Sequence, residues 1–285
     1  KHDDHSSAAA KKHSSFLSRN GRSNPFLIQD GDPIYTEGQE WDLAPIVVRD
    51  YKLVFFTQTN VGCTVFKQLF RRMMGLKDWK KENCCELLPW NPAKNGLSYL
   101  YHYDRETASR MLTDPSWTKA IFVRDPIERF VSAYLDKAVG NKYFLQQQCC
   151  QRPDNNLTQS DCTAAQQSIQ DFYKLAVICD NPHWRPQNRR IRPDHIWNDI
   201  NFVGHMETVA QDAERLLRRI GARERYGASG WNNASRFSPK PGQSHTPNSA
   251  RKIANIVDYD MKQRLLELYK DDYRHPVLNL TTGID

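Results

Sequence analysis

The chain has 285 residues, 39% of them hydrophobic, and a formal net charge of +7 at pH 7. This length and apolar content suit a globular protein with a substantial core. Part of the charge lies in residues 1–25, which hold five Lys/Arg and two Asp, so the remainder is only mildly basic. That balance suits an anionic ligand but argues against a nucleic-acid-binding surface. No apolar run approaches the roughly 20 residues that cross a bilayer.

The chain divides into a polar tail and a folded region. Residues 1–24 are rich in Ser, Ala, Lys and His, and they predict a disordered tail or stem. Residues 25–285 are predicted to form a single domain whose core begins near Pro45. There the stretch "PIVVRDYKLVFFT" predicts one or two short strands, because it is rich in Val, Ile and aromatic residues.

Three strand–helix units follow one another along the folded region. Apolar side chains from Val65 to Met74 share one helical face, and Gly75 ends that helix. "KAIFVRDP" predicts a buried strand, after which Pro126 begins a second helix. "DINFVGHMETVAQDAERLLRRI" predicts a third strand and helix, and "MKQRLLELYKDDY" predicts a C-terminal helix. This repetition predicts an α/β fold with a central, mainly parallel sheet.

The seven cysteines show no zinc-binding spacing. Without Cys63, which lies in a loop, six remain, enough for three disulfides. Residues 146–163 hold three of them and predict a disulfide-pinned insertion with a glycan on Asn156; further sequons occur at Asn233 and Asn279. These features favour the lumen of the secretory pathway, with reduced cytosolic thiols as the alternative. The six cysteines are Cys84, Cys85, Cys149, Cys150, Cys162 and Cys179.

The stretch "FFTQTNVGCTVFKQLFRRMMG" runs from a strand through a polar loop into a helix. Backbone N–H groups and the helix dipole at such a junction suit a phosphate. Gly62 allows close approach of the ligand to the backbone, and Thr64 adds a hydroxyl group. The stretch lacks the G-x-x-x-x-G-K-[ST] pattern of a Walker A loop. A structural turn without a ligand is the alternative.

A second anion-binding pattern lies in "FVRDPIERFVSAYLDK". Arg124 stands at a strand end and Ser132 on the following helix, away from its apolar stripe. An arginine and a hydroxyl placed in this way can grip a phosphate together.

The motifs "TNVGCTVFK" and "VRDPIERFVSAYLDK" resemble the two nucleotide motifs of Golgi carbohydrate sulfotransferases, which use 3′-phosphoadenosine-5′-phosphosulfate (PAPS). "NPHWRPQ" and "INFVGHMETV" are similar to two further landmarks of that family, in the same order. The resemblance covers roughly residues 52–208 and, more loosely, the C-terminal helix. It implies a P-loop-like, three-layer α/β fold that moves a sulfuryl group from PAPS to a glycan hydroxyl. PAP is then the product, and no metal is required.

The resemblance also implies where the protein works and how it holds the donor. We expect a type II membrane protein of the Golgi lumen whose anchor lies outside this sequence. The 3′-phosphate would be held by Arg124 and Ser132, with Arg129 as either a ligand or a member of an internal ion pair. The 5′-phosphosulfate would lie on Asn60, Val61, Gly62, Cys63 and Thr64.

Asn60 departs from the family pattern, which typically has a lysine two residues before the glycine. Sulfuryl transfer builds negative charge on a bridging oxygen, and losing one preorganised donor typically costs ~10²–10³ in rate. Lys67 is no obvious replacement, because the family tends to have a lysine there as well. Three interpretations stay open: a natural variant helped by another cation, an introduced inactivating change, or a binding protein without catalysis.

The acceptor hydroxyl needs a base, and histidine has the appropriate pKa range. His102, in "LSYLYHYDRETASRML", is the first candidate, because related heparan-type sulfotransferases resemble this layout. His183 is the competitor for catalysis. Beside it, Trp184 offers a face for sugar stacking, while Arg185 and Gln187 offer hydrogen-bond donors. The alternatives are a structural histidine and a loop with its tryptophan in the core.

Several weaker features complete the sequence. "NRRIRPDH" is a basic run that attracts an acidic polysaccharide or is simply solvated. His205 and Glu207 are expected to be structural, and residues 242–252 to cover the nucleotide. Alternative functions are a kinase-like phosphotransferase, a glycan-binding relative without turnover, and sulfation of a non-carbohydrate hydroxyl. The basic run contains Arg189, Arg190 and Arg192.

Overall fold

The computed structural model describes residues 28–37, 43–83, 87–227, 253 and 255–281. Its sheet has four strands in the order β1 (Ile46–Val48), β2 (Leu53–Phe56), β3 (Thr118–Val123) and β4 (Phe202–His205). β1 is antiparallel to β2, whereas β2, β3 and β4 run parallel to one another. All six residues of β3 are buried, as expected for a central strand covered on both faces.

Helices cover both faces of the sheet, so the α/β fold with a central, mainly parallel sheet is confirmed. One face packs against α1 (Cys63–Met73) and α6 (Val209–Arg219), through a cluster that includes Phe55, Phe66 and Phe122. Phe56 and Ile121 point to the other face, which α2 (Arg105–Thr113) and the 3₁₀ segment η8 (Asp194–Asp199) cover. The alternation of side chains along each strand produces these two cores.

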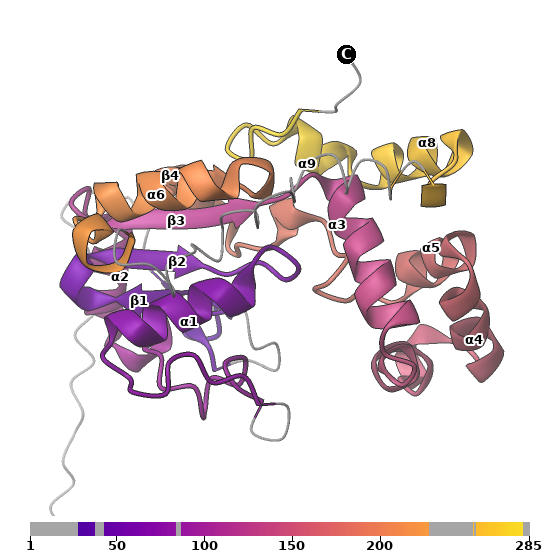
Figure 1. The fold of residues 1–285 in the computed structure, drawn as a ribbon, viewed down its shortest axis with the longest axis horizontal. Helices are drawn as coiled ribbons and strands as arrows, with labels where there is room; N and C mark the ends of the chain where they lie inside the picture. The colour runs from indigo at the N-terminus through magenta and orange to yellow at the C-terminus, as the bar shows by residue number, and fades with distance from the viewer. Residues whose placement is uncertain (1–27, 38–42, 84–86, 228–252, 254, 282–285) are drawn as a thin grey trace, which may run out of the picture.

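A helical region lies beside the sheet and is joined to it through α3 (Pro126–Ala133), as Figure 1 shows. It contains a π-helical turn, η4 (Tyr134–Val139), the short η5 (Gln146–Cys150), α4 (Gln159–Gln167) and α5 (Ile169–Ile178). The C-terminal helix is in fact two helices, α8 (Tyr259–Leu268) and α9 (Lys270–Arg274). These elements enclose a separate apolar core around Phe130, Phe172 and Trp184.

Two disulfides hold this helical region together, Cys149–Cys179 and Cys150–Cys162. They confirm the prediction of disulfide bonds, while Cys84 and Cys85, which a third bridge would need, lie outside the described residues. No described helix has the length and apolar character to span a membrane.

Candidate functional site

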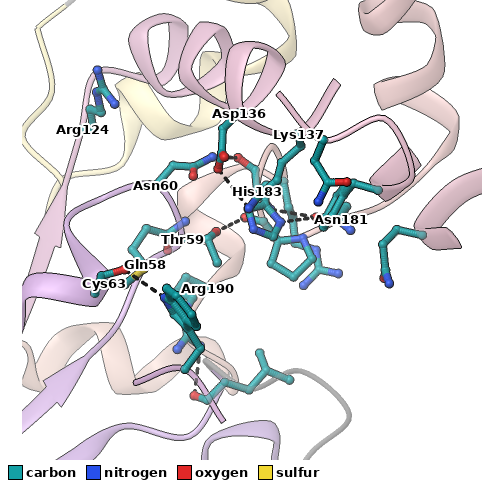
Figure 2. Close-up of a pocket in the computed structure, with 18 of the residues that line it drawn as sticks. Gln58, Thr59, Asn60, Cys63, Arg124, Asp136, Lys137, Asn181, His183 and Arg190 are labelled. Atoms are coloured by element: carbon teal, nitrogen blue, oxygen red, sulfur yellow. Dashed lines mark hydrogen bonds and ion pairs between the residues drawn. The ribbon is translucent and has the colours of Figure 1, made fainter. Parts of the chain in front are cut away.

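A cavity of about 1180 Å³ opens where β2 and β3 end, the edge at which open α/β sheets bind their ligands. The loop after β2, the start of α1 and Arg124 form one side of it. The segment from Asp136 to Arg152 and the segment from Asp180 to Arg190 form the other. Asn60, Asp136, Lys137 and His183 gather at one end of the cavity, and Arg124 lies apart from them (Figure 2).

The loop before α1 presents its backbone to this cavity. Gly62 is the N-cap of α1 with φ of +66°, a left-handed conformation that glycine adopts at little cost. No side chain caps the helix, so its first turn faces the cavity with Gly62, Cys63 and Thr64. Thr64 Oγ1 accepts a hydrogen bond from Trp90 Nε1 at 2.9 Å, which leaves the hydroxyl hydrogen to donate to a ligand. These groups suit a phosphate or sulfate.

Val61 does not face the cavity with the rest of the loop. Its side chain is buried in the core on the α1 face of the sheet, and its N–H donates to the carbonyl oxygen of Gln58 at 3.3 Å. A backbone contact from Val61 to a ligand is therefore not available in this conformation.

Asn60 has φ of +60°, so the chain at this position is left-handed. Asparagine tolerates this conformation better than most side chains, which gives Asn60 a backbone reason to be here. Its Nδ2 lies 3.5 Å from the carbonyl oxygen of His183, and its side chain lines the cavity. Asn60 thus connects the first loop with the segment that carries His183.

Two buried arginines hold the first loop in place. Arg129 donates from Nε to Thr59 O at 3.1 Å, from Nη1 to Arg185 O at 2.8 Å, and from Nη2 to Pro182 O. Burial lowers the pKa of Arg129 to about 10, so the guanidinium stays charged at neutral pH. Within the described residues Arg129 has no acidic ion-pair partner; it joins the two sides of the cavity through carbonyl groups.

Arg190 makes equivalent contacts below the same loop. It donates to Thr57 O and, from Nη1, to Leu43 O at 2.9 Å, and it is buried. The expectation of an exposed basic run is therefore wrong for its central member.

Arg124 lines the cavity and forms an ion pair with Glu128 at 3.4 Å between Nη2 and Oε2. Burial raises the pKa of Glu128, while the Arg124 guanidinium opposes that effect. Ser132 is half-buried one turn further along α3 and is not among the residues that line the cavity. An anion at this position would have to compete with Glu128 for the guanidinium.

Two side chains predicted to contact an acceptor are buried instead. Trp184 is 2% exposed, and its Nε1 donates to Cys179 O at 2.7 Å, so its ring packs in the helical core. Gln187 is completely buried, and its amide pairs with the backbone of Arg124. The predicted sugar-stacking face and the predicted Gln187 donor are therefore not available to an acceptor in this structure.

His183 lines the cavity, whereas His102 does not. The His183 Nδ1 lies 2.7 Å from Asn181 Oδ1, which also accepts the His183 backbone N–H at 3.1 Å. When Nδ1 carries the ring hydrogen, Asn181 Oδ1 accepts it, and Nε2 is then the ring nitrogen that can accept a proton. His102 is exposed in the 3₁₀ turn η3 (Leu100–His102), and its Nδ1 accepts the Tyr99 N–H.

The far side of the cavity carries cations that the sequence did not single out. Lys137 lies 2.9 Å from Asp136 and over the ring of Phe144, and Arg152 also lines the cavity. Arg185, which was predicted, lines the same wall and pairs with Asp180 at 2.7 Å.

The remaining predicted residues either make structural contacts or lie outside the described residues. His205 contacts Leu278 O, and Glu207 accepts the backbone N–H of Asp125, so both are structural, as expected. Residues 242–252 and Asn233 lie outside the described residues, as do Cys84 and Cys85. The described residues contain no group of three or more His, Cys, Asp or Glu side chains that could hold a metal.

Comparison with known proteins identifies the family. Residues 45–275 match the model of the sulfotransferase family, a range that includes every motif and both loops of the cavity. This chain belongs to the sulfotransferase family. The resemblance seen in the motifs is confirmed.

Several curated relatives are carbohydrate sulfotransferases. The chain is 26% identical over 253 residues to carbohydrate sulfotransferase 11 of Danio rerio, covering 81% of this chain and 66% of the relative. It is 30% identical over 198 residues to the Rattus norvegicus protein of the same name, covering 63% and 54%. With carbohydrate sulfotransferase 9 of Homo sapiens it shares 26% over 206 residues, covering 63% and 42%. The chain thus spans about two fifths to two thirds of the length of these relatives. No solved structure matches it.

Proposed function

We propose that this sulfotransferase moves a sulfuryl group from PAPS to a hydroxyl group of a carbohydrate. The observation that carries the proposal is one cavity that joins the uncapped start of α1 to the Arg124 side chain. Two anion-binding places on neighbouring strand ends suit a nucleotide with phosphates at two positions. The names of the relatives support a carbohydrate as acceptor.

We assign the two sides of the cavity to the two substrates. The donor end consists of Gly62, Cys63, Thr64 and Arg124, where backbone amides, a hydroxyl and a guanidinium bind and orient the two phosphate groups. PAPS supplies the sulfuryl group when it is bound there. The predicted role of Ser132 requires a local movement of its side chain toward the 3′-phosphate.

The acceptor end consists of Lys137, Phe144, Arg152, His183 and Arg185. His183 Nε2 accepts the proton of the acceptor hydroxyl, and Asn181 holds the ring in the tautomer that permits this. A base placed in this way typically contributes ~10²–10⁴ in rate. We therefore assign the base to His183 rather than to His102.

Asn60, which stands where the family typically has a lysine, suggests a second candidate function. The protein would then bind both substrates without turnover. We favour the enzyme, helped by another cation, because Lys137 lines the same cavity. Asn60 itself donates hydrogen bonds from the boundary between the donor end and the acceptor end. The proposal needs no metal, since amides and cations meet the negative charge.

We also propose the Golgi lumen as the place of action. The two disulfides require an oxidising compartment. Asn156 and Asn279 are exposed, so both sequons are accessible to glycosylation.

The test is transfer of labelled sulfate from PAPS to a panel of glycans and small alcohols, with thermal shifts for PAP and ATP measured alongside. We expect labelled product on at least one glycan, and stabilisation by PAP. Transfer only to non-carbohydrate alcohols would show that the acceptor is not a carbohydrate. Stabilisation by ATP but not by PAP would end the sulfotransferase assignment of the donor end.

A further inference from the structure

Gln187 makes a paired contact with the backbone of Arg124. The Arg124 N–H donates to Gln187 Oε1 at 3.1 Å, and Gln187 Nε2 donates to Arg124 O at 2.8 Å. The Gln187 side chain is completely buried and does not line the cavity. Its amide therefore satisfies both polar backbone groups of one residue at the point where β3 ends, and it fixes the direction in which the chain leaves the strand.

Gln187 is itself held by the C-terminal helix α9. Asp272 accepts the N–H of Gln187 through Oδ2 and the N–H of Asn188 through Oδ1, both at 2.8 Å. Asp272 is completely buried, so these bonds are shielded from water. From the same helix, the Tyr273 hydroxyl donates to Asp125 Oδ2 at 2.8 Å. Helix α9 thus supports the loop after β3 at two neighbouring residues.

Among the described residues, the Arg124 side chain has no comparably firm support. Its contact with Glu128 is long, 3.4 Å, and a ligand anion would replace it. The position of the guanidinium relative to an anion therefore depends on where the Arg124 backbone is held. Three distant parts of the sequence, at 124, 187 and 272, meet to hold it.

We propose that Gln187 is a positioning residue for Arg124, supported by Asp272, and that this pair determines how well the site recognises a 3′-phosphate. The inference rests on the proposed function and extends it. Neither residue contacts the nucleotide. Their loss weakens the contribution of the 3′-phosphate selectively, because the rest of the donor end belongs to the loop before α1.

The experiment compares affinities for PAP and for AMP, which lacks the 3′-phosphate, by calorimetry. The readout is the ratio of the two dissociation constants, because a general loss of folded protein leaves it unchanged. The variants are Arg124→Ala, Gln187→Glu, Asp272→Asn and the double variant Arg124→Ala/Gln187→Glu. Gln187→Glu keeps the shape but places a carboxylate oxygen against the Arg124 carbonyl. The matched controls are Gln263→Glu and Asp271→Asn, at exposed positions of α8 and α9.

Arg124→Ala is expected to lower the preference for PAP by about tenfold to 100-fold, the range for a hydrogen bond to a charged group. Gln187→Glu should lower the preference for PAP over AMP by about tenfold, and Asp272→Asn should lower it by less. The affinity of both variants for AMP should stay nearly constant. The double variant should match Arg124→Ala, since Gln187 acts only through the arginine. The controls should match the wild type. If Gln187→Glu does not fold, the ratio of the PAP and AMP dissociation constants of Asp272→Asn tests the positioning role instead.

Two results would overturn the inference in distinguishable ways. If Arg124→Ala lowers the preference but neither Gln187→Glu nor Asp272→Asn does, the donor site stands and the positioning role is wrong. If the wild type binds PAP no better than AMP, the proposed donor site fails, and the positioning role fails with it.

Discussion

The donor end and the acceptor end of the cavity are built by different means. The donor end stands on the edge of the sheet, where the ends of β2 and β3 place Gly62 and Arg124. The acceptor end stands on short helices and on the segment around His183, tied by the disulfides Cys149–Cys179 and Cys150–Cys162.

This difference separates what each end contributes. Strand pairing fixes the donor end, so a ligand with two phosphates meets preformed geometry there. Side-chain packing in the helical region fixes the acceptor end, and this can change without moving the sheet. Substitutions at the acceptor end should therefore alter transfer and leave nucleotide binding alone, whereas those at the donor end should alter nucleotide binding.

The largest effect is expected at His183. His183→Gln removes the base and should lower the transfer rate by about 10²–10⁴-fold, while PAP affinity stays within about twofold of the wild type, as separate ends require. His102→Gln is the control and should transfer normally. The measurements are steady-state transfer and calorimetry. If His183→Gln transfers sulfate at the normal rate and His102→Gln loses most of its transfer rate, the base is His102 rather than His183.

Arg129 joins the two ends, so its loss should affect both. Arg129→Ala removes the guanidinium donor from the carbonyl groups of Thr59 and Arg185, while Pro182 O keeps the Thr59 hydroxyl. The loss should lower the free energy of unfolding by roughly 3–5 kcal/mol. Urea denaturation measures this. Arg264→Ala, at an exposed position of α8, should change little. A loss below about 1 kcal/mol would mean that the two ends do not depend on this arginine.

Glu128 competes with the ligand at the donor end. Glu128→Gln should tighten PAP binding by about twofold to fivefold, the value of a modest ion pair. Burial raises the pKa of Glu128, so the carboxyl takes up its proton at a higher pH than an ordinary glutamate. The advantage of the variant should thus be full when Glu128 is ionised and should shrink as pH falls through that raised pKa.

The control for Glu128 is Glu106→Gln, in an exposed i,i+4 pair with Arg110. Calorimetry at several pH values compares each variant with the wild type, which cancels the titration of the ligand itself. Weaker binding by Glu128→Gln would show that Glu128 helps to hold Arg124 in its binding position.

The smallest effect is expected where the two ends meet, at Asn60. Asn60→Lys should change the transfer rate by no more than about twofold, because other cations already serve the cavity. This is small beside the ~10²–10³ that one essential donor contributes. Asn60→Gly, which keeps the left-handed backbone, is the control for strain. A gain of 10²-fold or more in Asn60→Lys would instead identify this chain as a catalytically impaired relative.

The sequence predicted the donor end better than the acceptor end for a physical reason. The spacing of apolar residues around Phe55, Phe66 and Phe122 determines which segments form strands and helices. Because the strands are parallel, their carboxyl ends bring Gly62 and Arg124 to one edge of the sheet. No comparable period governs the loop "NPHWRPQ". Whether its side chains face the cavity depends on contacts with distant residues.

Gln187 shows this limit most clearly. Its partners are the Arg124 backbone and Asp272, which lie 63 and 85 residues away in sequence. The same holds for Arg190, whose place in a basic run suggested exposure, although its partners at residues 43 and 57 hold it in the interior. Local pattern gives the type of element, whereas burial of a polar side chain requires its distant partners to be known.

The most direct test of the two-ended site is a crystal structure with PAP bound. We expect the 5′-phosphate to lie roughly 3 Å from the amides that begin α1 and the 3′-phosphate at a similar distance from the Arg124 guanidinium, with Glu128 displaced. A complex in which Arg124 stays on Glu128 while the nucleotide lies elsewhere, or meets only one of the two loops, would contradict this expectation.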